Sequence, residues 1–517
     1  MIEVAAVSGA LSRLGVVAVA CLAAAALVDR EPRRRAVAIL GALVLAPALL
    51  LGSIWRSPQL GVVHRHPLFA FVGALAAVIA VGALAVAIAR RPALFAPLMV
   101  IALPFRVPIE SGGITNNLLV PLYAVVAAGS LALALPALQG RRGAAPRQSE
   151  PGAPPARRGV ASARPSVASA WRDVRRLQQL LALYLVLYAL QATYSPGLGK
   201  QALQNVVFFY VPFALMFCVL LRLVWTPQLL RACLMLLAAL AVLFALVGFV
   251  EYATKTLLLN PKLIAANDVH AYFVINSVFF DPDIFGRFLA LAMILLASGL
   301  LYGRRGREQL ITGGVLAVLW GALVLTLSRS SLAALLVGLG MLAALRWNAS
   351  RTVVVTVAVV AVGAAAVAAS PTTFGLNQGA NGASAGRAGL VSSGATMFGR
   401  RPLWGYGSGS FVDEYRKLHP ATSQTLAASH TIPVTIAGEQ GLIGELAYLG
   451  LLFAAALVLL RRVRSDHART AIAAAFVALV FHTLLDADFL EDPDTGALLG
   501  IGAAPALAAR APAGQRR

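Results

Sequence analysis

The stretch Leu426–Gly450, LAASHTIPVTIAGEQGLIGELAYLG, places polar groups directly before a hydrophobic segment. His430 lies between two hydroxyl residues, and Glu439 follows within the same stretch. A histidine titrates near neutral pH, so it can take a proton from an attacking hydroxyl group. His430 is therefore a candidate general base, and Glu439 either orients it or interacts with the positive N-terminus of the following helix. The alternative is a histidine without a chemical role, because other expected outer loops carry histidines too: His64, His66, His270 and His419.

Arginines supply the second kind of chemistry. Arg329 interrupts two apolar runs in LTLSRSSLAALL, where a charge is costly unless it faces a polar cavity or a partner. The planar guanidinium group donates two parallel hydrogen bonds, which suits phosphate. The alternative for Arg329 is a side chain that extends to the membrane surface and closes a helical hairpin. Arg387 and Arg401 belong to a loop with an excess of positive charge, and Arg287 is expected one turn inside a span, where it faces the same cavity or pairs with Asp283.

These residues belong to a very apolar chain. Of its 517 residues 59% are hydrophobic and 12% are charged, whereas soluble domains are roughly 25% charged. Runs such as Arg307–Arg346 are long enough to cross the bilayer, and spans of this kind must be helical because lipid offers the backbone no hydrogen bonds. The sequence predicts an all-α integral membrane protein with about 14–15 transmembrane helices. The three cysteines all fall in apolar segments and show no metal-ligand or disulfide spacing, so they are expected to be small core residues.

The distribution of basic residues predicts the orientation. The net charge is +22, and most arginines fall in short loops between spans, which indicates cytoplasmic loops and contacts with anionic membrane lipids rather than nucleic acid. The predicted cytoplasmic loops are Asp29–Arg35, Arg90–Pro92, Gly303–Glu308, Arg346–Arg351 and Arg461–Arg469. Between them lies a long outer loop, residues 370–435. The candidate base and the arginines are therefore expected on the outer face.

The domain organisation follows from the same pattern. Residues 1–138 form an N-terminal group of transmembrane helices, and residues 139–176 form a basic, Pro- and Ala-rich cytoplasmic linker that is expected to be disordered. The linker could also bind anionic lipid or a cytoplasmic partner. Residues 177–511 form the C-terminal transmembrane body, and residues 512–517 a cytoplasmic tail.

Two local signals predict helix starts and turns near the candidate residues. Asp281 and Pro282 precede a span and are typical of a capping residue followed by the first helical position. In the long outer loop, GYGSGSF at Gly405–Phe411 supplies tight turns, and aromatic residues such as Phe411 and Trp404 could pack there.

Three blocks of residues resemble the O-antigen ligase and polymerase family of bacterial envelope glycan assembly. They are TLSRSS at Thr326–Ser331, GRAGLVSSGATMFGRRPLWGYGSGSF at Gly386–Phe411 (an arginine, a short amphipathic helix, then a Gly-rich turn), and SHTIPVTIAGEQGLIG at Ser429–Gly444. A looser fourth block, VFFDPDIFGRFLA, has Asp283 where the family usually has Asn. The likeness covers about residues 251–460, and the N-terminal half is similar by hydropathy alone.

The resemblance implies a metal-independent, GT-C-like glycosyltransferase in the bacterial inner membrane, without a cofactor and with its active site on the outer face. The donor would be a glycan on undecaprenyl diphosphate, and the acceptor a sugar hydroxyl of a glycan or lipid-linked molecule. Arg329 and Arg387 would bind the pyrophosphate, with Arg401 and Arg287 as further positive groups. His430 would activate the acceptor, with Glu439 as its helper or as a helix cap. Envelope assembly proteins are potential partners, and the motifs do not separate ligases from polymerases.

Two functions of other classes compete with this interpretation. A lipid-linked glycan flippase or transporter is one, although transporters concentrate charged residues near the bilayer midplane, often in two related halves. Here the candidate residues cluster at one face and no internal repeat is evident. A non-catalytic envelope scaffold is the other, and it predicts that replacing His430 or Arg387 leaves the glycan product unchanged.

Overall fold

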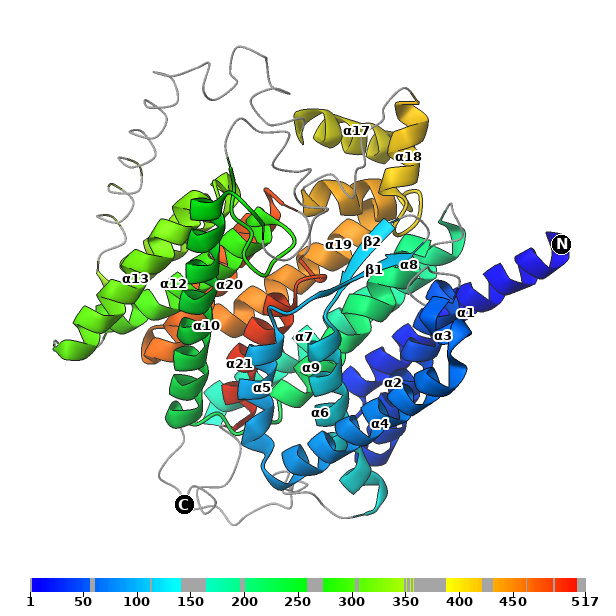
Figure 1. The fold of residues 1–517 in the computed structure, drawn as a ribbon, viewed down its shortest axis with the longest axis horizontal. Coiled ribbons are helices and arrows are strands. Elements are labelled where there is room, and N and C mark those ends of the chain that lie inside the picture. Colours follow the sequence, from blue (N-terminus) through cyan, green and yellow to red (C-terminus); the bar gives the residue numbers. More distant parts are fainter. Residues whose placement is uncertain are drawn as a thin grey trace.

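The computed structural model describes residues 2–55, 61–111, 114–140, 164–195, 200–257, 273–302, 306–347, 350, 354, 357, 387–420, 431–461, 463–486 and 489–508. This part of the chain forms a bundle of long helices (Figure 1). Nine of the described helices are long and apolar enough to cross a membrane. The prediction of an all-α integral membrane protein is confirmed. The total of 14–15 spans stays a prediction, because most of the expected span 351–371 lies outside the described residues.

Among the described residues, the N-terminal half contributes six α-helices. They are α1 (Ile2–Val28), α2 (Pro32–Ile54), α3 (Gly61–Arg65), α4 (Pro67–Arg90), α5 (Phe95–Ala102) and α6 (Val120–Leu138). A short 3-10 helix, η2 (Pro92–Leu94), precedes α5.

The C-terminal half contributes the remaining helices. They are α7 (Arg164–Gln191), η3 (Ala192–Tyr194), α8 (Lys200–Asn205), the π-helix η5 (Val206–Tyr210), α9 (Val211–Leu220), α10 (Pro227–Thr254), α12 (Pro282–Tyr302), α13 (Arg307–Leu325), α14 (Arg329–Arg346), α17 (Arg387–Arg400), α18 (Phe411–Leu418), α19 (Ile432–Leu460), η8 (Val463–Ser465), α20 (His467–Thr483) and α21 (Pro493–Ala508). One hydrophobic core joins both halves, since α1 packs on α7 and α6 packs on α9. The proposed division into an N-terminal group and a C-terminal body therefore concerns chain order rather than separate cores.

The expected linker is shorter than the sequence indicates. Helix α7 begins at Arg164, so residues 164–176 are helical and correct the linker boundary, while residues 141–163 lie outside the described residues. Asp173 lies in this helical stretch, and its carboxylate pairs with Arg461 at the end of α19. Arg461 also donates a hydrogen bond of 2.8 Å from Nη2 to Ser169 Oγ.

A β-hairpin, absent from the predicted elements, occupies the loop between α5 and α6. Strands β1 (Val107–Ser111) and β2 (Ile114–Leu118) are antiparallel, with Ser111 opposite Ile114. Two glycines separate the strands in the sequence, and a Gly-Gly pair is a favoured two-residue hairpin connection. The signal is brief and lies between long apolar runs, which is why hydropathy alone assigns it to a loop.

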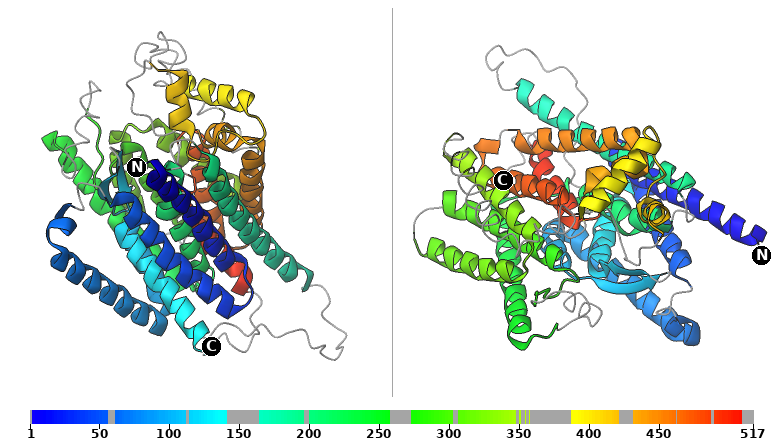
Figure 2. Two further views of the ribbon diagram at one scale, coloured as in Figure 1. Left: turned by 90° about the vertical axis from the view of Figure 1, so that its right-hand side faces the viewer. Right: turned by 90° about the horizontal axis from the view of Figure 1, so that it is seen from above.

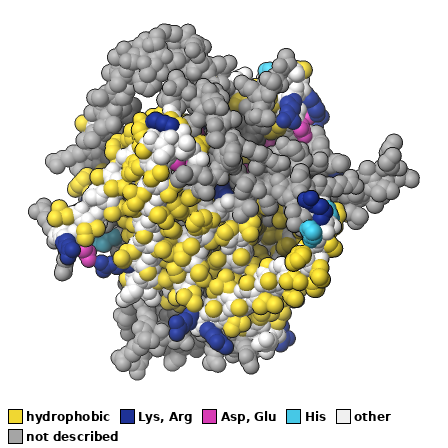
Figure 3. Space-filling view, viewed as in Figure 1, with side chains coloured by type: hydrophobic (Ala, Val, Ile, Leu, Met, Phe, Trp, Pro, Cys, Tyr) yellow, Lys and Arg dark blue, Asp and Glu magenta, His cyan; other side chains and the backbone are white. Residues whose placement is uncertain are grey.

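Helices α17 and α18 lie beyond the start of α19 at one end of the bundle, which we call the α17 end (Figures 1 and 2). In the space-filling view, hydrophobic side chains cover the middle of the face (Figure 3). Lysine and arginine side chains lie at its lower edge and near α17 and α18. This apolar band between charged edges agrees with a multi-pass membrane protein.

Candidate functional site

The beginning of α12 matches the capping signal in the sequence. Pro282 is the first helical residue, and Asp281 Oδ1 accepts a hydrogen bond of 2.7 Å from the backbone N–H of Asp283. The side chain of Asp281 thereby satisfies one of the N–H groups that a helix start leaves without an intrahelical partner. The predicted helix start is therefore confirmed. This helix start places Asp283 at the α17 end of the bundle.

The beginning of α14 lies against the beginning of α12. Ser328 is the N-cap, and its Oγ accepts from the backbone N–H of Ser331 at 3.2 Å. Ser331 Oγ in turn donates to the backbone carbonyl of Asp283 at 3.1 Å. The helices approach closely because Gly286 has no side chain, since a Cβ there would lie 2.8 Å from Ser331 Oγ. This packing brings Arg329, the exposed first residue of α14, beside the start of α12.

Arg387 attaches the beginning of α17 to the same place. Its Nη2 lies 3.5 Å from Asp283 Oδ2, and its Nη1 donates a hydrogen bond of 2.8 Å to the carbonyl of Leu485. Asp283 also accepts a long contact of 3.4 Å from Ser330 Oγ. Residues far apart in the sequence therefore meet at the N-termini of three helices, α12, α14 and α17. Helix N-termini and guanidinium groups both favour anions.

Arg287 lies beneath this surface. Its Nε is 2.8 Å from Asp492 Oδ2, and the side chains are 2% and 1% exposed. The alternative partner, Asp283, lies next to Arg387. A carboxylate from the segment before α21 balances the charge of Arg287, so Arg287 is a buried part of the site.

His482, at the end of α20, is a buried residue of this site that the sequence analysis missed. It is fully buried, and its Nε2 lies 3.2 Å from Ser331 Oγ. Arg287 and Arg387 are both close enough to affect it electrostatically. A histidine at the end of an apolar run, next to the acidic stretch Leu484–Asp494, was the available signal. We call Asp283, Arg287, Arg329, Arg387 and His482 the arginine site.

Arg401 does not join the arginine site. It follows the last residue of α17, whereas Arg387 is the first, so the two are separated by roughly 20 Å of helix. The Arg401 guanidinium carbon lies 4.4 Å from the centroid of the Tyr406 ring, which is a cation–π contact. Three of the four predicted arginines therefore lie in the arginine site, and the fourth, Arg401, lies at the other end of α17.

Glu439 is buried within α19 and binds the Gly-rich turn. Its Oε2 accepts from the backbone N–H of Gly409 at 2.7 Å, and its Oε1 accepts from that of Phe411 at 2.9 Å. Phe411 is the first residue of α18, so the carboxylate caps that helix. Gly405 has φ +66, and a Cβ there would lie 2.2 Å from the Glu439 carbonyl oxygen, so the turn requires glycine. Phe411 is buried as expected, whereas Trp404 is 59% exposed.

His430 lies outside the described residues. The next residue, Thr431, is the N-cap of α19. Shortly after it, Val434 packs against Gly394 in the middle of α17, where a Cβ would lie 2.4 Å from Val434 Cγ1. Gly394 and Arg387 belong to the same helix and are about 10 Å apart along its axis.

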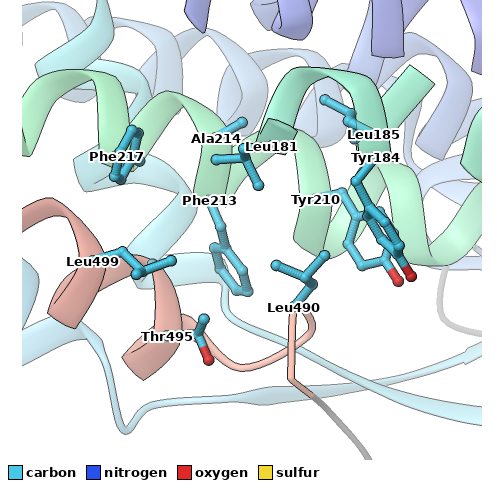
Figure 4. A pocket seen from close by; sticks show the side chains of 11 residues that line it. Leu181, Tyr184, Leu185, Tyr210, Phe213, Ala214, Phe217, Leu490, Thr495 and Leu499 are labelled. Atoms are coloured by element: carbon cyan, nitrogen blue, oxygen red, sulfur yellow. The ribbon is translucent and has the colours of Figure 1, made fainter. Parts of the chain in front are cut away.

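An apolar cavity of about 30 Å³ lies deeper in the bundle, between α7, α9 and α21. Tyr184 and Tyr210 lie beside one another at one side of it, and Leu490 lies below them (Figure 4). None of the predicted site residues lines it. A cavity of this size holds about two water molecules, so it is too small for a lipid chain.

Within the described part of the chain, no group of three or more histidine, cysteine, aspartate or glutamate side chains is placed to hold a metal ion. The positively charged groups of the arginine site are the side chains of Arg287, Arg329 and Arg387. They can bind an anion at its surface and stabilise negative charge that develops there.

Comparison with known proteins finds one region of the chain that matches a protein family. Residues 314–449 match the family model described as O-antigen ligase. The matched region runs from within α13 to within α19 and contains Arg329, Arg387, Arg401, His430 and Glu439. It ends before His482 and begins after Arg287. No curated protein matches the chain.

The chain is a membrane protein that contains an O-antigen ligase-like region, residues 314–449. The matched domain, together with a bundle of membrane-length apolar helices, supports an envelope glycan function of the ligase or polymerase type. Members of this family are glycosyltransferase-like enzymes that work on lipid-linked glycans.

Proposed function

We propose that this protein transfers a glycan from undecaprenyl diphosphate to a sugar hydroxyl of an acceptor, on the outer face of the bacterial inner membrane and without a metal ion. The observation that carries the proposal is the meeting of Arg387, Asp283 and the Ser328–Ser331 segment at the N-termini of three helices. Such a site suits a diphosphate, because helix N-termini and arginines both stabilise anions. The match to the O-antigen ligase family supports the glycan as the transferred group.

In the proposed reaction, the acceptor hydroxyl oxygen forms a bond to the anomeric carbon of the donor sugar. The bond between that carbon and the diphosphate oxygen breaks, and undecaprenyl diphosphate leaves with the electron pair. Arg387 and Arg329 bind the diphosphate and stabilise the charge that develops on its leaving oxygen. Arg287, whose charge Asp492 balances, supports the site from beneath. Arg387 and Arg329 supply the charge that a metal ion supplies in other phosphate sites.

His430 takes the proton of the acceptor hydroxyl in this mechanism. The support is its position in the chain: it precedes the N-cap of α19, and the first turn of α19 packs on α17 about 10 Å from Arg387. Glu439 contributes by fixing the Gly-rich turn through Gly409 and Phe411, and Arg401 provides positive charge at the far end of α17 for the more distant part of a substrate.

The experiment that tests the proposal is transfer by the purified full-length protein in detergent with a chelator present. An undecaprenyl-diphosphate oligosaccharide serves as donor, a sugar serves as acceptor, and product length distinguishes a ligase from a polymerase. We expect Arg387→Ala to lower kcat/KM by about 10²–10³-fold and His430→Ala by about 10²–10⁴-fold. Arg416→Ala, a change of an exposed arginine in α18, is the matched control and should transfer like wild type.

Each other outcome has a defined meaning. Transfer by wild type that requires a divalent cation would remove the metal-independent mechanism. Equal transfer by His430→Ala would show that another group accepts the proton. A wild-type protein that binds the donor but does not transfer it, while Arg387→Ala abolishes movement of the donor across vesicle membranes, would favour the flippase function.

A further inference from the structure

Arg387, the residue proposed to bind the donor diphosphate, already contacts a carboxylate. Asp283 Oδ2 lies 3.5 Å from Arg387 Nη2, and the two side chains are 27% and 35% exposed. The other described contact of the guanidinium group is with a neutral acceptor, the carbonyl of Leu485. Asp283 therefore occupies the position on Arg387 that an incoming anion would take.

The contact is loose for an ion pair. Charge-assisted N–H···O bonds measure about 2.7–2.9 Å, which is the distance found in the buried pair of Arg287 with Asp492. Among the described residues, the remaining carboxylate oxygen of Asp283 receives a 3.4 Å contact from Ser330. A partly exposed and loosely held pair exchanges partners at little cost. Near the site the structure thus contains one buried pair, Arg287 with Asp492, and one longer and partly exposed pair, Arg387 with Asp283.

We propose that Asp283 sets the affinity of the site by competing with the diphosphate for Arg387. This inference rests on the proposed function, and it adds a residue whose charge opposes binding. When the site is empty, Asp283 neutralises Arg387 and helps to hold the start of α17 against α12. When a diphosphate binds, it displaces the carboxylate from the guanidinium group, and the two anionic groups repel each other across the site.

The competition favours the donor over the product. In the donor the diphosphate carries a substituent at both ends, whereas the released lipid diphosphate has a free terminal phosphate with an additional ionisable oxygen. A nearby carboxylate repels the more highly charged product more strongly. Asp283 therefore promotes release of the lipid diphosphate after transfer, and returns to Arg387 as the product leaves.

The test measures binding of farnesyl diphosphate, which has the free terminal diphosphate of the product, to the purified full-length protein in detergent. Asp283→Asn removes the charge and keeps the size of the side chain. We expect it to bind the probe about three to five times more tightly than wild type. Asp413→Asn, the same change on α18, is the matched control and should bind like wild type.

A second pair of variants shows whether the effect acts through Arg387. Arg387→Gln should weaken binding, and adding Asp283→Asn to it should give no gain. Equal or weaker binding by Asp283→Asn, in a protein where Arg387→Gln does weaken binding, would overturn this inference and leave the proposed diphosphate site in place. Unchanged binding by Arg387→Gln would instead remove Arg387 from the proposed site, and this inference with it.

Loss of the Asp283 contact could also loosen α17, which thermal unfolding of each variant would reveal. If Asp283→Asn unfolds at a lower temperature than wild type, Asp283→Ser decides the matter, because it also removes the charge and retains an oxygen for Ser330. Tighter binding of farnesyl diphosphate by that variant supports the competition, and no gain overturns it.

Discussion

Arg287 and Asp492 are two opposite charges that the fold removes almost completely from solvent, with side chains 2% and 1% exposed. Taking one partner away leaves the other as a buried, unbalanced charge, which typically costs about 3–5 kcal/mol. We therefore expect Asp492→Asn to lower the free energy of unfolding by about that amount. The measurement is unfolding of the purified protein in mixed micelles with increasing denaturing detergent.

The matched control is Glu308→Gln, which disrupts the exposed pair between Arg231 and Glu308. Exposed ion pairs contribute little, so this variant should unfold like wild type. The double variant Arg287→Met, Asp492→Leu removes both charges and should be more stable than Asp492→Asn alone. If Asp492→Asn were as stable as wild type, the pair would have no structural role.

The arginine site also shows how far single residues can be interpreted from sequence. Arg329 and Arg387 are conspicuous because each interrupts an apolar or glycine-rich segment, and both lie at the expected end of the bundle. His482 is less conspicuous, because it lies at the end of an apolar helical run and its partner, Ser331, is distant in the chain. Contacts of this kind depend on how α14 and α20 pack, and that packing has no local signature.

Glu439 connects three elements: it belongs to α19, caps α18 and holds the glycine turn that follows α17. Glu439→Gln retains one acceptor oxygen and places an amide NH₂ against a backbone N–H. We expect this variant to lose about 1.5–3 kcal/mol of local stability. Hydrogen exchange followed by mass spectrometry should show faster exchange over residues 405–418, because one of the two amides, that of Gly409 or that of Phe411, loses its acceptor.

The same experiment separates the two expected roles of Glu439. If it instead orients His430, Glu439→Gln would leave exchange over residues 405–418 unchanged and would shift the pH dependence of transfer. Glu445→Gln, in the same helix but facing a different part of the bundle, is the control and should leave both measurements as in wild type.

Local signals predict single elements well and their partners poorly. The Asp281–Pro282 helix start and the short helix before the glycine turn are confirmed at α12 and α17, because capping and periodicity act within a few residues. The hairpin between α5 and α6 was missed, since its strands are short beside long apolar helices. The predicted contact of Glu439 with the start of the following helix was also wrong. Glu439 caps α18, which the chain reaches through the glycine turn, and not the start of α19.

At the scale of the molecule, the charged groups divide between the two ends of the bundle. The arginine site, α17 and α18 lie at one end (Figures 1 and 2). The turn between α1 and α2 lies at the other, next to the end of α6, where a Cβ on Gly140 would lie 3.6 Å from Arg33. That turn carries the basic cluster Asp29–Arg35, which the distribution of basic residues assigns to the cytoplasm.

This arrangement predicts which ends of the molecule an impermeant reagent can reach. We expect a cysteine at Arg416 in α18 to react with a membrane-impermeant maleimide in intact spheroplasts, and a cysteine at Arg34 to react only after permeabilisation. Both side chains are exposed, so accessibility to the reagent depends on the membrane alone. The native cysteines are replaced first, because Cys21 is exposed. Labelling of Arg34→Cys in intact spheroplasts, with Arg416→Cys protected, would show that the molecule has the opposite orientation. The arginine site would then face the cytoplasm, where a lipid-linked glycan on the outer leaflet could not reach it.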